Sequence, residues 1–268
     1  MIVVGEMVNA TRRHIGEAIK TRDHKVVEEE IRKQDLAGAH YLDLNASTGT
    51  GDLDKEIDDM KWLIDIALDS TGKSLAIDTA DSKVMRHAAE HIGGRRSWLM
   101  NSIKGDAEAM ESLLPIAIGH KVPFIALAMD STGIPRDALQ RIAICRNILS
   151  EVSKSGIPEE NVFFDPILLP ISTDITQGKV SLETLSGLKE QFPQSKTTMG
   201  LSNISHGLPQ RSLINQAFLL TAISYGLDSV ICDPTDPGIQ RAIALGELIS
   251  GRDRHCRRFT RKVRKGEV

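Results

Sequence analysis

Short apolar segments alternate with longer segments of helical periodicity along the whole chain. Eight of the short segments are rich in Val, Ile, Leu and Phe, and they lie at residues 2–5, 40–44, 74–78, 97–101, 123–127, 161–165, 197–201 and 229–232. Each is nearly continuous in its apolar character, which is typical of parallel strands that are covered on both faces. The pattern therefore predicts eight buried parallel strands.

The segments between the predicted strands are long enough for crossover helices and carry helix boundaries. Asp23 is the predicted N-cap of a helix that stops at Gly38, and Asp54 is the predicted N-cap of the next one. A helix over residues 212–225 is almost wholly apolar, so we expect it to be buried on more than one face.

Strands that alternate with helices eight times predict an α/β fold, specifically a (β/α)8 TIM barrel. An open doubly wound sheet is the alternative, and the lack of a glycine-rich turn after the first strand argues against it. No linker or low-complexity stretch divides the chain. We therefore expect one domain over residues 1–268, with residues 251–268 as a C-terminal tail.

Composition indicates in which cellular compartment this barrel is expected. A chain of 268 residues can bury a large core without disulfide bonds or metal ions to stabilise it. Its three cysteines show no CxxC spacing, which argues against a disulfide framework. No apolar run approaches the length of a membrane span, and the first residues lack the pattern of a signal peptide. These features predict a cytoplasmic protein that does not engage a membrane.

The net charge of −3 hides an asymmetry between the body and the tail. Residues 251–268 carry eight Lys and Arg against two acidic residues, so the tail stands at +6 and the rest of the chain at −9. A basic tail can bind nucleic acid or an acidic protein. Because the tail lacks a series of aromatic stacking residues, we expect a solvated terminal helix and no nucleic-acid partner.

Polar residues recur where the predicted strands end. They are carboxylates, amides and one hydroxyl, namely Glu6, Asn9, Asp43, Asn45, Asp78, Asn101, Asp165, Ser202, Asn203 and Asp233. Single Asp and Asn residues also favour loops and helix caps. In a barrel, however, residues just past the carboxyl ends of the strands converge on one face, so the set as a whole predicts a binding site.

The residue types at these strand ends restrict the chemistry. We find no histidine or cysteine among them, which argues against a His/Cys zinc site and against a Ser-His-Asp or Cys-His nucleophile. Clustered carboxylates remain able to hold Mg²⁺. Inward-facing acceptors also suit a neutral ligand with a donor-rich edge, such as the amidine edge of a pterin or purine.

Two local motifs suggest a phosphate site and a zinc site, but their positions in the predicted fold argue against both. Residues 67–74 nearly match a phosphate-binding loop, but they close a helix and open a strand, which is the reverse of the required order. His87 and His91 match a zinc pattern, but they lie on the helix after the third strand, which in a barrel faces outward.

Taken together, the short motifs around the strand ends resemble one family over residues 2 to about 250. They are Gly5-Glu6-Met-Val-Asn9, Leu42-Asp43-Leu-Asn45, Ile77-Asp78-Thr79, Met100-Asn101-Ser102, Thr132-Gly-Ile-Pro135, Phe164-Asp165-Pro166, Leu169-Pro170, Gly200-Leu-Ser-Asn203 and Arg211-Ser-Leu-Ile-Asn215. The chain resembles the methyltetrahydrofolate:corrinoid protein methyltransferases. These pterin-binding barrels are related to the folate module of cobalamin-dependent methionine synthase and to dihydropteroate synthase.

The resemblance implies a homodimeric barrel with no metal of its own. It implies tetrahydrofolate or 5-methyltetrahydrofolate as substrate and cobalamin carried by a corrinoid protein partner, with the direction of methyl transfer left open. Carried over by position, Asp78, Asn101 and Asp165 hold the edges of the pterin ring, and Asn203 lies by N5. Ser202 and Arg211 match positions near the ring.

Two alternatives follow from the same resemblance. Dihydropteroate synthase carries a Ser-Arg-Lys run after its seventh strand, where this chain has Ser202-Asn203-Ile204, and its N-terminal Pro-Asp-Ser-Phe loop is absent here. The other alternative is a noncatalytic folate-binding barrel that recruits a partner through its basic tail.

Overall fold

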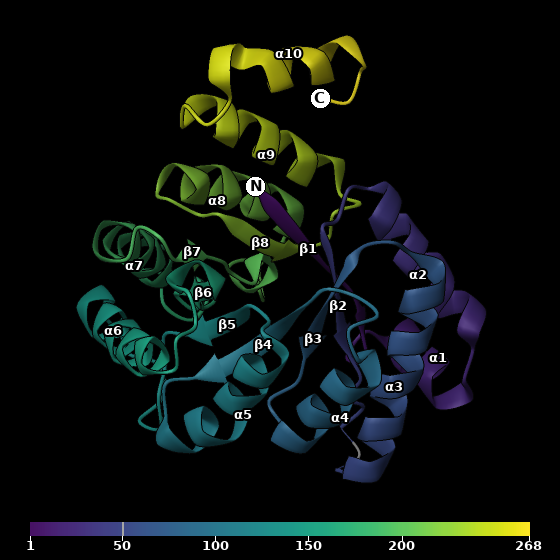
Figure 1. Ribbon diagram of the computed structural model, residues 1–268. Coiled ribbons are helices and arrows are strands. Elements are labelled where there is room, and N and C mark those ends of the chain that lie inside the picture. Colours follow the sequence, from purple (N-terminus) through teal and green to yellow (C-terminus); the bar gives the residue numbers. More distant parts are fainter. Residues whose placement is uncertain (50) are drawn as a thin grey trace.

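The computed structural model describes residues 1–49 and 51–268 and is built around a parallel β-barrel (Figure 1). Its strands are β1 (Ile2–Asn9), β2 (Tyr41–Asn45), β3 (Ser74–Asp78), β4 (Trp98–Lys104), β5 (Phe124–Leu127), β6 (Val162–Asp165), β7 (Lys196–Thr197) and β8 (Ser229–Cys232). Each of β1 to β6 pairs with the next strand along the chain, and β8 pairs with β1.

The barrel closes between the short β7 and β8. The Ile231 amide donates to the Met199 carbonyl at 2.9 Å, and the Asp228 amide donates to the Thr197 carbonyl at 3.3 Å. The predicted (β/α)8 barrel is therefore confirmed, and the open sheet is wrong. The seventh strand is shorter than predicted, because the chain turns into a 3₁₀ helix at Leu201–Asn203.

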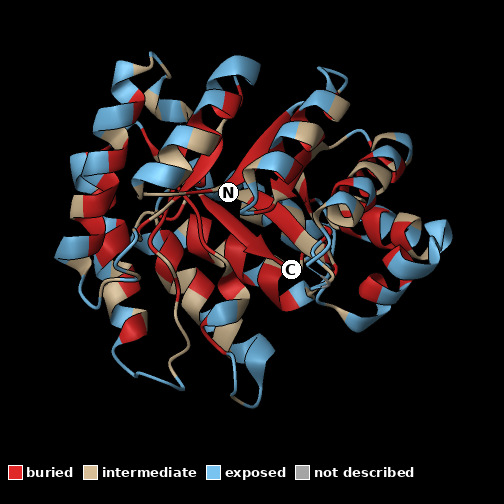
Figure 2. Cartoon of the chain, turned by 90° about the horizontal axis from the view of Figure 1, so that it is seen from below, coloured by how far each residue is buried: buried red, intermediate tan, exposed pale blue. Residues whose placement is uncertain are grey.

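Helices surround the barrel, and their outer faces are exposed while the strands are buried (Figures 1 and 2). They are α1 (Arg13–Thr21), α2 (His24–Leu36), α3 (Leu53–Ser70), α4 (Ser82–Ile92), α5 (Ala107–His120), α6 (Ala138–Lys154), α7 (Gln177–Gln191), α8 (Arg211–Ser224), α9 (Pro237–Ile249) and α10 (Arg257–Arg264). None of the helices in the described ranges is long and apolar enough to cross a membrane.

Aspartates begin several of these helices by accepting a hydrogen bond from a backbone amide in the first turn. Asp23 caps α2 as predicted. The prediction for α3 is wrong by two residues, because Asp52 is the N-cap and accepts from the Lys55 amide, while Asp54 lies inside the first turn. Both carboxylates precede the same apolar stripe, so the periodicity alone did not distinguish them.

Helix α8 is less buried than its composition predicts. Only Leu219, Ala222 and Ile223 of this helix are buried, and Leu213 is 61% exposed. The helix packs mainly against α9, and its Ile214, Phe218 and Leu220 side chains are partly buried against the same core. The prediction of burial on more than one face is therefore wrong in its extent, because the fully buried residues lie on one face.

The basic tail forms α10, which packs on the outer side of α9 (Figure 1). Its first turn is fixed by the buried carboxylate of Asp253, which accepts from the Arg258 and Phe259 amides at 3.0 and 2.8 Å. The predicted terminal helix is present, and its arginines and lysines are largely exposed.

The inside of the barrel contains two successive layers of side chains. An apolar layer of Val4, Ala76, Leu99, Ile125, Phe163 and Ile231 fills the lumen. Side chains at i and i+2 of a strand point to the same face, so the residue two positions further on points inward one layer higher. On five of these six strands that next residue is polar: Glu6, Asp78, Asn101, Asp165 and Asp233. The apolar layer is therefore the floor of a polar site.

Candidate active site

Two amide–carboxylate pairs, one buried and one partly buried, form the part of the site that comes from β2, β3 and β4. The Asn101 amide donates to Asp43 at 3.1 Å, and the Asn45 amide donates to Asp78 at 2.9 Å. The register aligns Asp78 with Asn101 across β3 and β4. Each amide donates one N–H to a carboxylate. The remaining oxygens of Asp43 and Asp78 make this side of the site rich in hydrogen-bond acceptors.

Burial sets the electrostatics of the two carboxyl groups. It raises the pKa of Asp43 well above its ordinary value, and the nearby Asp78 carboxylate raises it further, while the hydrogen bond from Asn101 lowers it. The pKa of Asp78 is also raised, mainly by burial. Such groups gain from a ligand that supplies hydrogen-bond donors, because those donors replace the lost water.

Asp165, the last residue of β6, is a further carboxyl group of the site, and like Asp43 it is buried. One of its oxygens accepts the Ile167 amide at 2.7 Å. Burial raises its pKa to about 7, against the lowering effects of the Ile167 hydrogen bond and the Arg141 charge. A carboxyl group with a pKa near neutrality changes its protonation state in the range where enzymes commonly work.

The opposite side of the site comes from β1 and from the segment after β7. The Ser202 hydroxyl donates to Glu6 at 2.5 Å, and Arg12 donates to the same oxygen at 3.2 Å. Burial raises the pKa of Glu6, and the hydrogen bond from Ser202 lowers it. The contact between Ser202 and Glu6 joins residues that are 196 positions apart, so it fixes the segment after β7 against β1.

Asn203 and Arg211 lie on the rim. Asn203 ends the 3₁₀ helix and is exposed, and within the described ranges its side-chain amide makes no hydrogen bond. Arg211, the first residue of α8, donates to the Ser202 carbonyl at 2.7 Å and to the Ser205 hydroxyl at 3.2 Å. The predicted residues therefore divide into groups that have hydrogen-bond partners and one exposed amide that has none within the described ranges.

Asp43, Glu6 and Arg141 were not among the ligand-binding residues predicted from the sequence. The first two follow the same i, i+2 pattern along β2 and β1 as the assigned residues, so that pattern could have found them. Arg141 is fully buried in α6. An arginine among apolar helix positions is a sequence signal for it, because arginine is almost never fully buried unless it is paired.

The prediction that no cysteine lies at the end of a strand is wrong for one residue. Cys232 is the last residue of β8, so a thiol does stand at a strand end. It is 1% exposed and packs in the layer between barrel and helices, and burial raises its pKa well above the ordinary value. A buried neutral thiol of this kind behaves as an apolar side chain.

The histidine pattern of α4 makes ordinary surface contacts. His91 lies 2.8 Å from Asp65, and His87 lies 3.8 Å from Glu90. Across residues 1–49 and 51–268, no group of three or more His, Cys, Asp or Glu side chains is arranged to hold a metal ion.

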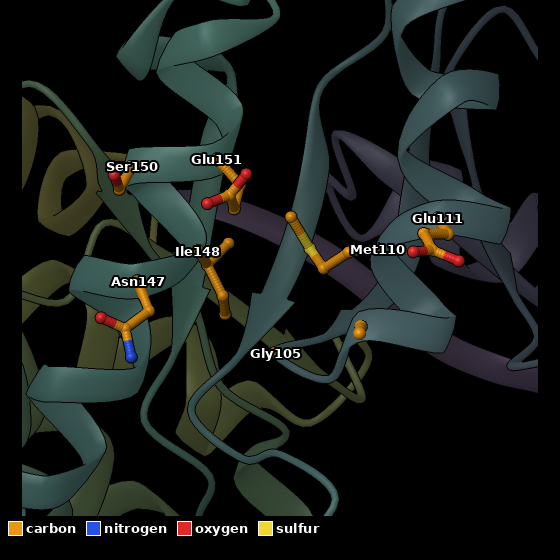
Figure 3. A pocket seen from close by; sticks show the side chains of 8 residues that line it. Gly105, Met110, Glu111, Asn147, Ile148, Ser150 and Glu151 are labelled. Atoms are coloured by element: carbon orange, nitrogen blue, oxygen red, sulfur yellow. The ribbon is translucent and has the colours of Figure 1, made fainter.

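Cavities also occur outside the barrel mouth. A surface cavity of 410 Å³ lies between α5 and α6, where Figure 3 shows Met110 and Ile148 among its lining side chains. Another, of 340 Å³, lies at the carboxyl end of β4 and is lined by Ser102 and Lys104. Neither of these two cavities is lined by Glu6, Asp78, Asn101, Asp165 or Asp233, so both are separate from the polar layer.

Comparison with known proteins defines the class of this barrel. A family model described as pterin binding enzyme matches residues 5–233. That match spans β1 to the end of β8 and therefore includes every polar strand end described above. The chain belongs to the pterin binding enzyme family, and the resemblance predicted from the motifs is confirmed.

Two individual proteins are similar to this chain in sequence. The chain is 28% identical over 270 residues to the methylcorrinoid:tetrahydrofolate methyltransferase of Eubacterium limosum, which covers 100% of this chain and 98% of that protein. It is 28% identical over 274 residues to the methionine synthase of Mycobacterium tuberculosis, covering 95% of this chain and 22% of that much longer protein.

Solved structures show the same fold. A Yersinia pestis dihydropteroate synthase with a pterine-sulfa conjugate superposes with a TM-score of 0.70 at 18% identity, over 93% of both chains. A second structure of that enzyme, with a sulfonamide drug complex, gives a TM-score of 0.70 at 16% identity, over 93% of this chain and 94% of that chain.

Proposed function

We propose that this protein is a methyltransferase that moves a methyl group between N5 of tetrahydrofolate and the cobalt of a corrinoid protein. The observation that carries the proposal is the combination of buried acceptor groups with one exposed amide in a chain that aligns end to end with a methylcorrinoid:tetrahydrofolate methyltransferase.

The buried groups fit one edge of a pterin. That edge presents an N–H beside an NH₂ group, and a carboxylate accepts from both through parallel hydrogen bonds. Asp78 and Asp165 offer such oxygens above the apolar floor, and Asn101 can accept through its carbonyl while its amide donates to Asp43. These residues bind and orient the ring.

Asn203 is the residue we assign to catalysis. A methyl group on a tertiary amine leaves only when its nitrogen gains a proton or a strong hydrogen bond, because otherwise a strongly basic anion is expelled. The corrinoid partner supplies the cobalt centre that exchanges the methyl group. The Asn203 amide can donate to N5, or turn and accept from a protonated N5, so it stabilises the transition state without acting as a formal acid.

The Ser202 and Arg211 contacts support that role by fixing the backbone next to Asn203. Arg211 holds the Ser202 carbonyl, and the Ser202 hydroxyl is held by Glu6. The side chain of Asn203 thus turns on a fixed main chain. Solvent supplies the N5 proton through the carboxyl groups of the site in this proposal.

The proposal is tested by exchange with the free cofactor. The purified protein is mixed with 5-methyltetrahydrofolate and reduced cobalamin, and methylcobalamin formation is followed by its absorption spectrum. Turnover supports the proposal. Folate binding without exchange in either direction, with free cobalamin or a purified corrinoid protein, contradicts it and favours the noncatalytic barrel. Condensation of a pterin diphosphate with p-aminobenzoate would instead identify a dihydropteroate synthase.

The assembly and location of the protein belong to the same proposal. We expect a homodimer and a cytoplasmic setting, as the family resemblance implies, with the barrel mouth left accessible to the corrinoid protein. Light scattering after size-exclusion chromatography measures the first, and a monomer at micromolar concentration would contradict it.

A further inference from the structure

Arg141 of α6 is an arginine with no exposed surface. Its guanidinium faces five acceptors: Nε donates to the Pro135 carbonyl at 2.9 Å and Nη2 to the Gln177 side chain at 2.7 Å. The two N–H groups of Nη1 are shared among the carbonyls of Pro166 at 2.9 Å and Ile167 at 2.8 Å and the Ser181 hydroxyl at 3.3 Å. These partners come from the segment after β5, the segment after β6, and α7. All three guanidinium nitrogens therefore donate to protein acceptors.

The central partner, Ile167, has an unusual backbone conformation. Its φ is 60°, in the left-handed region that β-branched residues rarely adopt. The Ile167 carbonyl accepts from Arg141 and also from the Ser181 hydroxyl at 3.1 Å, while its amide donates to Asp165 at 2.7 Å. A strained residue persists only where its surroundings hold it, and here Arg141 and Asp165 hold it from its two polar ends.

We propose that Arg141 is a positioning residue that keeps the Asp165 carboxylate in the orientation and the ionised form in which it accepts hydrogen bonds from the pterin ring. This inference rests on the proposed function, since it concerns how Asp165 binds folate. Arg141 acts through Ile167, whose amide fixes one Asp165 oxygen and leaves the other for the ligand.

The charge of Arg141 gives it a second effect on the same group. Burial raises the pKa of Asp165 to about 7, and the Arg141 charge lowers it. Cys145, also on α6, interacts with Asp165, but burial keeps its thiol neutral. Asp137 acts on Arg141 itself, and Asp174 accepts from Gln177. Removal of the Arg141 charge therefore raises the pKa of Asp165.

A purely structural role for Arg141 predicts a different outcome. The arginine joins α6 to α7 through Gln177 and Ser181, so its loss could simply weaken the packing of these helices. Such weakening lowers stability without moving the pH dependence of folate binding. The pH profile therefore separates positioning of Asp165 from general support of the fold.

The test uses Arg141→Met, which removes the charge and the fork, and Arg141→Lys, which keeps a charge but loses the fork. Tetrahydrofolate binding is titrated by calorimetry from pH 5.5 to 8.5. For the unmodified protein, affinity should fall as the pH drops through about 7. We expect Arg141→Met to weaken binding by roughly 10- to 100-fold at pH 7 and to move this midpoint upward. Arg141→Lys should weaken binding and keep the midpoint.

A double variant shows whether the effect passes through Asp165. In an Asp165→Asn background, Arg141→Lys should change the Kd by less than about 3-fold, because residues in one network are not additive. An unmoved midpoint in Arg141→Met overturns the inference, as does unchanged affinity in Arg141→Lys. If Arg141→Met does not fold, the lysine variant and the double variant decide. Absence of folate binding to the unmodified, folded protein instead contradicts the proposed function.

Discussion

The two sides of the barrel mouth differ in burial and in hydrogen bonding. On the buried side, which consists of Asp43, Asn45, Asp78, Asn101 and Asp165, carboxyl groups lie above an apolar floor and amides donate to two of them. On the exposed side, which consists of Ser202, Asn203 and Arg211, the Asn203 amide faces solvent. A preorganised set of acceptors is suited to holding a ring, whereas a free amide can follow a change of protonation at N5.

The largest expected effect is on turnover, from the exposed side. Asn203→Ala should lower the rate of methyl exchange by ~10²- to 10³-fold, because it removes the hydrogen bond that stabilises the transition state. The folate Kd should change far less. Stopped-flow absorption measures the rate, and Asn147→Ala on the outer face of α6 is the matched control. Equal losses of rate and affinity would reduce Asn203 to a binding residue.

On the buried side the order of effects should be reversed. Asp165→Asn should weaken tetrahydrofolate binding by roughly 10- to 100-fold, because a hydrogen bond to a charged group contributes about 1.5–3 kcal/mol. Turnover at saturating folate should change less than affinity does. Calorimetry at pH 8 gives the Kd, with Asp69→Asn on the exposed surface of α3 as control. An unchanged Kd would remove Asp165 from the binding site.

Stability should also distinguish the two sides. Asn101→Ala leaves the Asp43 carboxyl buried without its amide donor, so the free energy of unfolding should fall by about 1–3 kcal/mol. Asn203→Ala should change it by less than about 0.5 kcal/mol, because its side chain is exposed. Urea unfolding of both variants tests this, and similar losses would mean that the sides do not differ in packing.

The smallest expected effect is a pH dependence of stability. The pKa of Asp165 is raised in the folded protein to about 7 from the ordinary value of 3.8. Its stabilising contribution is therefore complete below the unfolded pKa and is lost as the pH rises through 7. Between pH 6 and 8 the free energy of unfolding should fall by about 1 kcal/mol from this group.

Asp165→Asn is the control for that dependence, since an amide does not titrate. The raised pKa of Asp43 and of Asp78 adds to the same trend in both proteins, so only the difference between the two curves belongs to Asp165. Identical slopes in urea unfolding across this range would contradict the raised pKa of Asp165.

Local sequence information predicted the elements that depend on neighbouring residues. The apolar runs at 74–78 and 229–232 coincide with β3 and β8, because continuous apolar character marks a doubly covered strand. The same information gave the wrong N-cap for α3 and too much burial for α8. Asp52 and Asp54 offer the same capping chemistry two positions apart, and apolar composition does not say which faces of a helix pack against another element.

The order of residues alone predicted the barrel and the level of its site, because the i, i+2 alternation places a polar residue directly above an apolar one on five of the six strands that form the floor. The hydrogen-bond partners and the pKa values of these polar groups depend on the tertiary structure. Asn101 reaches Asp43 across 58 residues, and Arg141 reaches Ile167 across 26. Hydrogen bonds and burial depend on distances in space between segments far apart in sequence, so the raised pKa of Asp165 and the role of Arg141 appear only once the barrel has closed.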